Sequence, residues 1–344
     1  MKISVLLNHD FDAPGARGVE ACAEIAKVAE AVAKALRRRP GARVEILPCR
    51  GDSCSFVDRL RADPPDLVFN LCESLAGDSR GEAAVPAILD ALGLAYTGSG
   101  AATLALALHK PLAGAALRGS GVPVPPGVCI AAIEELEGTA AAVALDAVGF
   151  PAIVKQARED ASVGITRASV VRDRPSLRRQ VLAVLEGLGQ EALVERYVDG
   201  REIYAAFLGD GLLLFTEIDF SAVPEGRPRI VTYDAKWIEG SEDWRQTPSG
   251  PARIDDPALR ARIEQVALAA FRALGLRDYG RVDLRVDADG RPWVVDVNAN
   301  CGLAPDAGFA GAAAAAGLSH PAMIGRIVDA ALARHHARPP RHAR

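Results

Sequence analysis

Strand-like and helix-like segments alternate over the first hundred residues, and this alternation restricts the fold more than any other feature of the sequence. Short apolar runs at 2–7, 44–47 and 66–71 predict buried strands, whereas 19–38 and 83–92 have helical spacing. In a strand–helix–strand order, each helix returns the chain to the same end of the sheet, so consecutive strands run parallel. We therefore predict an N-terminal α/β unit built on a doubly wound parallel sheet.

The pattern changes after a break at 121–127, where proline and glycine are concentrated. Before the break, a helix is expected to follow Gly100 and to run to about Leu117. After it, strands often follow one another directly, which is typical of an α+β arrangement. The predicted strands are 153–155, 167–171, 191–196, 202–208, 211–219, 281–287 and 292–298, and the predicted helices are 175–188, 256–274 and 321–335. The last two strands should form a hairpin that turns at 288–290.

Charge and apolar content exclude several classes of function. The chain has 40 basic and 44 acidic residues, a net charge of −4, which gives no general electrostatic reason to bind nucleic acid or an anionic membrane. No apolar run approaches the ~20 residues of a membrane span, and the start of the chain is apolar over too few residues for a signal peptide. The six cysteines show neither CxxC spacing nor the density of a secreted scaffold, so we expect a cytoplasmic protein.

Several common catalytic motifs are missing from the sequence. Residues 98–103 nearly match GxGxxG but lack the third glycine, and no P-loop, HExxH or GxSxG motif occurs. The six histidines are scattered, and three of them lie near the C-terminus. The chain therefore offers little material for imidazole-based metal binding or acid–base catalysis.

The predicted hairpin carries polar residues suited to binding a divalent cation. Asp283 and Asp296 lie on adjacent predicted strands as cross-strand neighbours, and Asn298 shares a face with Asp296 because strand side chains alternate. Two carboxylates and an amide oxygen are hard ligands that Mg²⁺ accepts together with water and phosphate oxygens. The alternative is that these acidic residues lie on the solvent face of the hairpin.

Lysine is rare, which draws attention to the lysines in the middle of the chain. Only six of the 40 basic residues are lysines, and Lys110, Lys155 and Lys236 each adjoin a distinctive segment. Lysine ammonium groups suit phosphate oxygens, and a nucleoside triphosphate held without a P-loop needs such charges from separate elements. Lys236 lies in a long polar stretch, 220–250, of the kind that is often functional or mobile. The alternative for each lysine is an ordinary solvated position.

A series of short motifs matches a known family in order along the chain. The motifs are Tyr96-Thr97-Gly98-Ser99, His109-Lys110, Phe150-Pro151-Ala152-Ile153-Val154-Lys155, Arg158-Glu159 with Ser162-Val163-Gly164, Val194-Glu195-Arg196-Tyr197, Gly200-Arg201-Glu202, Tyr233-Asp234-Ala235-Lys236, Gly280-Arg281-Val282-Asp283 and Asp296-Val297-Asn298. In this order they resemble the ATP-grasp enzymes of the D-alanine–D-alanine ligase family over about residues 1–330.

The resemblance implies an ATP-grasp fold whose first part is the doubly wound parallel-sheet domain. The expected divisions are a Rossmann-like domain (1–100), a central subdomain (101–190), a C-terminal subdomain (191–335) with a lid at 220–250, and a basic tail (336–344). Enzymes of this kind join a small-molecule carboxylate to an amine through an acyl phosphate, releasing ADP. The resemblance is also compatible with a homodimer.

The resemblance assigns a role to individual residues. Lys110, Lys155, Lys236 and the loop of Ser162 would contact the ATP phosphates, Glu195 and the backbone of Arg196 to Val198 the adenine, and Glu202 the ribose. Two Mg²⁺ ions, for which Mn²⁺ could substitute, would be held by Asp283, Asp296 and Asn298, with Asp296 bridging. The catalytic groups would be Lys236, which neutralises the transferred phosphoryl group, and Arg281 with the backbone N–H of Gly302, which stabilise a tetrahedral oxyanion.

The part of the sequence expected to bind the amino-acid substrates departs from the family. Residues 8–15 contain no clear counterpart of the glutamate that receives the first substrate's amine. Substitutions occur at Glu73 for a histidine, Ala161 for a serine, Trp237 for a tyrosine and Ala307 for a hydroxyl or lysine, and Asp296 replaces a glutamate.

A pocket without these polar groups should bind D-alanine poorly, so we expect a ligase whose substrates are not two D-alanines. The alternatives are a true D-alanine–D-alanine ligase with a reshaped pocket and a protein that binds ATP without turnover.

Overall fold

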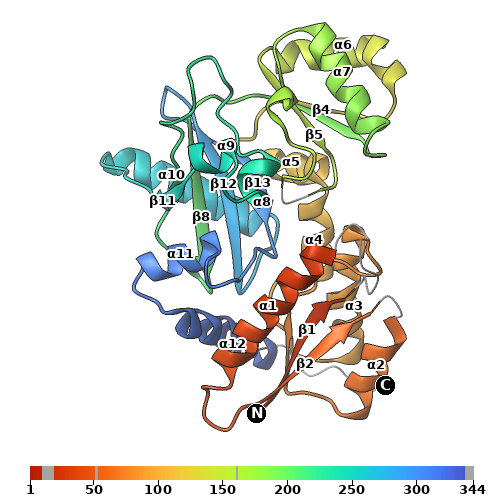
Figure 1. Ribbon diagram of the computed structural model, residues 1–344, viewed down its shortest axis with the longest axis vertical. Helices are drawn as coiled ribbons and strands as arrows, with labels where there is room; N and C mark the ends of the chain where they lie inside the picture. Colours follow the sequence, from red (N-terminus) through yellow and green to blue (C-terminus); the bar gives the residue numbers. More distant parts are fainter. Residues whose placement is uncertain (10–18, 51–52, 160–161, 338–344) are drawn as a thin grey trace.

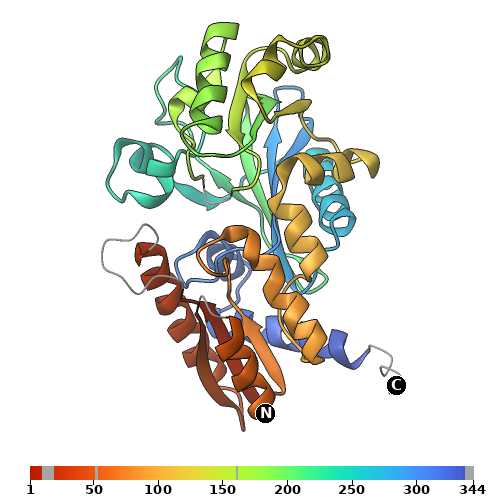
Figure 2. The same cartoon turned by 90° about the vertical axis from the view of Figure 1, so that its right-hand side faces the viewer.

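The computed structural model describes residues 1–9, 19–50, 53–159 and 162–337, which form three β-sheets and the helices that cover them (Figure 1). Ala161, the stretch 10–15 and most of the basic tail lie outside the described residues. Seen from two directions, the C-terminal sheet lies between the N-terminal sheet and the central sheet (Figures 1 and 2). This mixture of helices and sheets confirms the predicted α/β class.

The N-terminal sheet is parallel, as predicted. Strand β1 (Lys2–Asn8) pairs in parallel with both β2 (Arg43–Cys49) and β3 (Leu67–Asn70). The helices of this part are α1 (Val19–Leu36), α2 (Ser53–Ala62), the 3₁₀ helix η1 (Ser79–Ala83) and α3 (Ala84–Leu92). The side chain of Val5 joins the core cluster that contains α1, whereas Leu6 joins the cluster that contains α2 and α3. Burial on both faces explains why both Val5 and Leu6 are apolar, instead of one of the two facing solvent.

The single helix expected up to Leu117 is two helices. Helix α4 (Ala101–Leu108) ends at His109, and α5 (Lys110–Gly119) begins at the next residue. Pro111 explains the break, because proline is tolerated in the first turn of a helix but removes a hydrogen bond and clashes in a helix interior. The break places Lys110 at the start of α5, with its backbone N–H bonded to the carbonyl oxygen of Ala157 near the central sheet.

The central sheet is antiparallel and is covered by helices on one face. Its strands, in spatial order, are β4 (Gly127–Ile130), β7 (Ala192–Arg196), β5 (Ala152–Gln156) and β6 (Val170–Val171). Its helices are η2 (Ile133–Glu137), α6 (Thr139–Val148), η3 (Arg167–Ser169) and α7 (Arg174–Leu185). Val154 of β5 packs with α6 and α7, and its neighbours Ile153 and Lys155 therefore point to the other face. The strand predicted at 167–171 is correct only for its last two residues, because η3 occupies the rest.

The C-terminal sheet contains the predicted hairpin. Its strands are β8 (Arg201–Leu208), β9 (Gly211–Leu212), β10 (Thr216–Ile218), β11 (Ser249–Pro251), β12 (Tyr279–Val286) and β13 (Pro292–Asn298), and the order is β11-β10-β8-β12-β13 with β9 beside β8. Helix α10 (Pro257–Ala273) covers one face through a core that includes Val282, Leu284, Val294 and Val297.

A β-bulge in the hairpin sets which residues of β13 face the core. Asp283 pairs with Asp296, but the next residue, Leu284, pairs with Val294, so β13 holds one extra residue. Without the bulge, Val294 and Asp296 would share a face, because strand side chains alternate. The bulge keeps Val294 against α10 and turns Asp296 to the opposite face of the sheet.

The polar stretch 220–250 contains more regular structure than its sequence predicts. It forms the short helices α8 (Tyr233–Trp237) and α9 (Glu242–Gln246), followed by the start of β11. Both helices are capped by a hydroxyl side chain, Thr232 for α8 and Ser241 for α9, and such caps stabilise a single turn that lacks amphipathic spacing.

The end of the chain returns to the N-terminal sheet. After β13 come α11 (Gly308–Ala315) and α12 (His320–His336), and α12 packs against α1 (Figure 1). Met323, Ile327 and Val328 of α12 share a core cluster with the α1 residues, so the two ends of the chain stabilise each other. Among the described residues, no helix is long and apolar enough to cross a membrane.

Gly200 immediately precedes β8 and lies close to the backbone of β12, so a substitution at this position tests how closely the two strands pack. A Cβ atom at this position would lie 2.0 Å from the carbonyl oxygen of Val286, a backbone atom that cannot move independently. We expect Gly200→Ala to destabilise the protein by about 1–3 kcal/mol, seen as a lower midpoint of thermal denaturation. Gly211→Ala is the matched control in the same sheet, because its nearest atom is 3.6 Å away. Equal midpoints for the two variants would contradict this account of the packing.

Candidate active site

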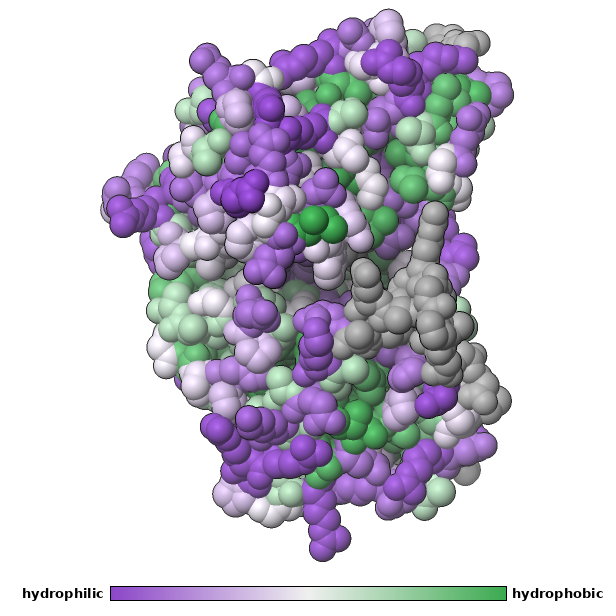
Figure 3. Space-filling model, in the orientation of Figure 1, coloured by the Kyte–Doolittle hydropathy of each residue, from purple (hydrophilic) through white to green (hydrophobic). Residues whose placement is uncertain are grey.

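A cavity of about 730 Å³ lies between the central and C-terminal sheets. The space-filling view is hollowed between the upper and lower halves of the face that it shows (Figure 3). All the predicted site residues except Gly302 line this cavity: Lys110, Lys155, Ser162, Glu195, Arg196, Val198, Glu202, Lys236, Arg281, Asp283, Asp296 and Asn298. Residues from separate predicted strands, a helix start and the polar stretch are thus brought to one place.

The acidic residues of the hairpin face this cavity rather than the solvent. Asp283 is 7% exposed, and it accepts hydrogen bonds from Arg281 at 2.6 and 2.8 Å and from the Asn298 amide at 3.2 Å. Asp296 accepts a hydrogen bond from Lys110 Nζ at 2.8 Å. The alternative interpretation of a solvent-facing acidic hairpin is therefore wrong.

The two carboxylates differ in their electrostatic surroundings. Burial raises the pKa of Asp283 above its usual value, although the Arg281 guanidinium opposes this effect. Burial would also raise the pKa of Asp296, but the ammonium groups of Lys110 and Lys155 outweigh it and hold that pKa below the usual value. Asp296 therefore stays ionised, and its negative charge is held in place by two lysines.

Asp283, Asp296 and Asn298 fit a magnesium site in which phosphate oxygens of a bound ligand complete the coordination. Asp283, Asp296 and Asn298 present hard oxygen donors to one cavity, and lysine and arginine cations contact the same carboxylates. The described residues contain no cluster of three His, Cys, Asp or Glu side chains placed to hold a metal. A metal here would thus draw some of its ligands from Asn298, water or phosphate oxygens, which suits Mg²⁺ better than a metal that needs an all-protein cage.

The central sheet contributes a second buried ion pair to the cavity. Lys155 Nζ lies 2.5 Å from Glu195 Oε2 on the neighbouring strand β7, and both side chains are nearly buried. The same ammonium donates a hydrogen bond at 3.2 Å to the carbonyl oxygen of Val295, the extra residue of the β13 bulge. Lys155 therefore connects the central sheet to the hairpin that carries Asp296.

Two residues of this cavity, Tyr204 and Arg285, were not predicted from the sequence. Tyr204 Oη donates a hydrogen bond to Glu202 Oε1 at 2.6 Å, and Arg285 pairs with Glu202 Oε2 at 2.8 Å. Each lies two residues beyond a predicted site residue on a strand, Tyr204 after Glu202 and Arg285 after Asp283. Strand alternation was the signal that could have found them.

The structure places the residues considered for binding the amino-acid substrates differently from those predicted to bind ATP. Gly302, Glu73, Trp237 and Ala307 do not line it, although the neighbours of Ala307, Asp306 and Gly308, do. Trp237 is 46% exposed on α8. The structure therefore does not bring these positions together in one cavity with the residues that the sequence predicts to bind the nucleotide.

Residues 117–329 match the family model described as "D-ala D-ala ligase C-terminus". The chain belongs to the D-alanine–D-alanine ligase family. It is 33% identical over 294 residues to the uncharacterized protein y4sG of Sinorhizobium fredii, covering 83% of each chain. It is 34% identical over 274 residues to a D-alanine–D-alanine ligase of Gloeobacter violaceus, covering 80% of this chain and 84% of the relative.

The fold is the ATP-grasp fold of this family. The structure matches the crystal structure of a D-alanine–D-alanine ligase from Bacillus anthracis with a TM-score of 0.77 at 22% identity, covering 98% of this chain and 99% of that one. The protein is therefore an ATP-dependent ligase that forms carbon–nitrogen bonds, and enzymes of the family generally use ATP and Mg²⁺.

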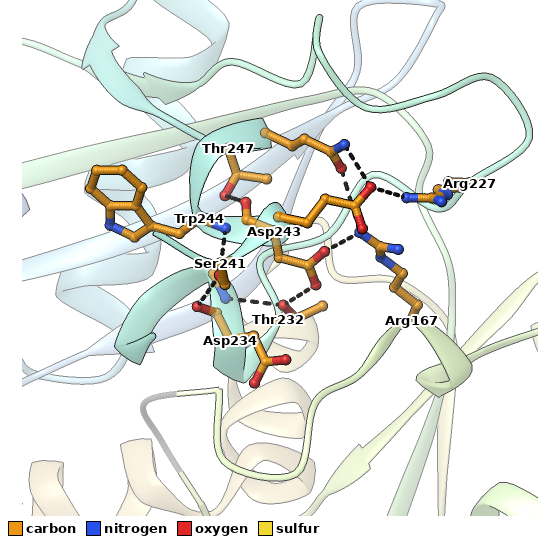
Figure 4. Close-up of polar contacts among 11 residues, drawn as sticks. Arg167, Arg227, Thr232, Asp234, Ser241, Asp243, Trp244 and Thr247 are labelled. Carbon is orange, nitrogen blue, oxygen red and sulfur yellow. Dashed lines mark hydrogen bonds and ion pairs between the residues drawn. The ribbon is translucent and has the colours of Figure 1, made fainter. Parts of the chain in front are cut away.

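In this ligase the polar stretch 220–250 is tied to the central sheet by one carboxylate (Figure 4). Asp243 of α9 accepts a hydrogen bond from Arg167 of η3 through one oxygen and from Thr232 Oγ1 at 2.6 Å through the other. Thr232 in turn caps α8 by accepting from the Ala235 N–H at 3.1 Å. Since α8 carries Lys236, Asp243 helps to set where that lysine enters the cavity.

A second carboxylate reinforces the attachment. Glu242 lies 2.7 Å from Arg227 within the stretch and 3.3 Å from Arg167 outside it. The Tyr233 N–H also donates to the carbonyl oxygen of Ile165 at 2.9 Å. The stretch is therefore an ordered segment that contributes residues to the cavity lining and is held mainly by charged hydrogen bonds.

Asp243→Ala should loosen this segment. Hydrogen bonds to charged groups contribute about 1.5–3 kcal/mol each, so backbone amides of 232–247 should exchange with solvent at least about tenfold faster. Hydrogen-exchange mass spectrometry measures this, and the N-terminal sheet should be unaffected. Glu225→Ala, an exposed acidic residue of the same stretch, is the control. Unchanged protection of α8 and α9 in Asp243→Ala would contradict the proposed attachment.

Proposed function

We propose that the protein joins a carboxylate to an amine through an acyl phosphate, using a substrate pair other than two D-alanines. The observation that carries the proposal is the convergence of Lys110, Lys155 and Lys236 with Asp283 and Arg281 on one cavity. Three ammonium groups can neutralise the negative charges of a triphosphate. The Arg281 guanidinium can donate hydrogen bonds to the oxygen of a carbonyl group that phosphorylation has activated.

In the proposed reaction, a substrate carboxylate oxygen attacks the γ-phosphorus of ATP and ADP leaves. The amine then attacks the carbonyl carbon, and the tetrahedral oxyanion that forms expels inorganic phosphate as the amide is made. The three lysines neutralise the phosphate oxygens, and Glu195 with the 196–198 backbone and Glu202 hold the adenine and the ribose. Asp283, Asp296 and Asn298 would hold Mg²⁺, which would supply further positive charge at the phosphates.

Arg281 is the proposed donor to the oxyanion, whereas Gly302, the second donor expected from the sequence, does not line the cavity. Burial would lower the pKa of Arg281, but Asp283 outweighs burial and keeps that pKa above its usual value. The guanidinium therefore stays charged in the cavity, where its attraction for a developing oxyanion is stronger than in bulk water. The segment 220–250 would exclude water from the acyl phosphate.

A different substrate pair is supported by the residues at the amino-acid end. Glu73 and Ala307 stand where the family pattern places a histidine and a hydroxyl or lysine, and neither lines the cavity. The methyl group of Ala307 cannot donate a hydrogen bond to a substrate carboxylate. Specificity for a substrate with a polar group depends on site residues that hydrogen-bond to that group. The second candidate is D-alanine–D-alanine ligation, which is favoured by the name of the Gloeobacter violaceus relative.

ADP release from Mg·ATP distinguishes these candidates. We expect little stimulation by D-alanine alone and clear stimulation by another pair from a panel of D- and L-amino acids and small amines. Mass spectrometry of the products identifies the amide. Stimulation by D-alanine with a D-alanyl dipeptide as the product would overturn the proposed substrate difference and support the second candidate.

Asp283→Asn tests the metal assignment with the same assay. Loss of one anionic ligand should lower ADP release at least about 100-fold, because charge stabilisation at the transferred group is lost. Nucleotide binding without added metal should persist. Asp289→Asn is the control, since Asp289 lies exposed in the turn of the same hairpin. ADP release at the wild-type rate by Asp283→Asn would contradict the assignment of Asp283 as a metal ligand.

A further inference from the structure

One face of the C-terminal sheet carries the polar groups of the cavity, and Tyr204 lies at its centre. On β8, Tyr204 is opposite Asp283 of β12, while Glu202 is opposite Arg285 and Ala206 is opposite Arg281. Ile203 and Phe207 of β8 point to the other face, into the core beneath α10. Tyr204 is thus the only large uncharged side chain among these positions of β8 and β12.

The hydroxyl group of Tyr204 completes the support of Glu202. It donates to Glu202 Oε1 at 2.6 Å, while Arg285 holds Glu202 Oε2 at 2.8 Å. Each carboxylate oxygen therefore has its own donor, which fixes the plane of the group. Burial, and then the nearby Glu202 and Asp283 carboxylates, raise the pKa of Tyr204 well above its usual value, so the hydroxyl keeps its proton and remains a donor.

The ring of Tyr204 supports a different group. The Arg281 guanidinium carbon lies 4.4 Å from the ring centroid, within the range of a cation–π contact. Arg281 also donates to both oxygens of Asp283. The guanidinium is therefore held from two directions, by a carboxylate in front of it and by an aromatic face.

We infer that Tyr204 is a positioning residue with two separable actions: its hydroxyl orients Glu202 for the nucleotide, and its ring orients Arg281 for the reacting carbonyl. The inference rests on the proposed function, in which Glu202 binds the ribose and Arg281 stabilises the oxyanion. One side chain thereby links nucleotide affinity to the chemical step.

Two substitutions separate the actions. Tyr204→Phe keeps the ring and removes the hydroxyl, so the KM for ATP should rise about 3–10-fold with kcat within about twofold. Tyr204→Leu removes the ring as well, so kcat should fall by a further 2–30-fold or so. A purely structural role would instead lower kcat and raise KM together in both variants. Equal kcat values in the Phe and Leu variants would overturn the action on Arg281.

A double substitution tests whether the hydroxyl acts through Glu202. Glu202→Ala should itself raise the KM for ATP, and adding Tyr204→Phe should then cause little further change, because the Tyr204 hydroxyl has already lost its acceptor. Independent, multiplying effects of the two substitutions would overturn the action on Glu202. This arm needs only Tyr204→Phe and Glu202→Ala, so it remains decisive if the Leu variant does not fold.

Nucleotide binding separates failure of this inference from failure of the proposed function. Binding of a fluorescent ATP analogue to the full chain needs no amino-acid substrate, and Tyr204→Phe should weaken it by the same 3–10-fold, approximately. Wild-type affinity in Tyr204→Phe would overturn the inference whatever the substrates are. A protein that binds ATP, shows the Tyr204→Phe effect and releases ADP with no pair would contradict the proposed function but not the action on Glu202.

Discussion

Pairing of buried opposite charges is the constraint on which the cavity depends. Taking an isolated charge out of water costs several kcal/mol, so each buried carboxylate needs a cation or several donors. Asp283 has Arg281, Asp296 has Lys110, Glu195 has Lys155 and Glu202 has Arg285. The Arg281–Asp283 pair lies within β12, Lys155–Glu195 within the central sheet and Glu202–Arg285 within the C-terminal sheet. Lys110 at the start of α5 instead pairs with Asp296 of the hairpin, and Lys155 also donates to the Val295 carbonyl oxygen of the hairpin. These two lysines, proposed to bind ATP, therefore also connect separate parts of the chain at the cavity.

Backbone geometry decides which side chains take part. The β-bulge after Asp283 turns Asp296 toward the cavity while Val294 stays in the core, and it leaves the Val295 carbonyl oxygen as an acceptor for Lys155. The proline after Lys110 ends one helix and begins another, which brings that lysine to the same place. The β-bulge in β13 and the helix break before Pro111 thus bring Asp296 and Lys110 within hydrogen-bond distance of each other.

The sequence was sufficient to predict the parallel N-terminal sheet and the hairpin, because both depend on strong apolar periodicity. It did not reveal α2, α6 or α11, which are short or rich in alanine and glycine and depend on tertiary packing. In the site, lysine rarity and strand alternation indicated Lys155 and Asp296 correctly as cavity residues. Tyr204 and Arg285 lie two residues along a strand from predicted site residues, so alternation places them on the cavity face, but it does not show that both contact Glu202. Likewise, the attachment of α9 through Asp243 depends on Arg167, 76 residues away.

Following one oxygen atom tests most directly whether the reaction passes through an acyl phosphate. A carboxylate substrate that supports ADP release is labelled with ¹⁸O in its carboxylate group and incubated with ATP and the amine. If the carboxylate attacks the γ-phosphorus, its oxygen bridges carbon and phosphorus and leaves with the phosphate when the amine attacks. The released inorganic phosphate should therefore carry one ¹⁸O atom for each amide formed. Amide formation with unlabelled phosphate would contradict an acyl-phosphate route and the roles proposed here for the lysines and Arg281.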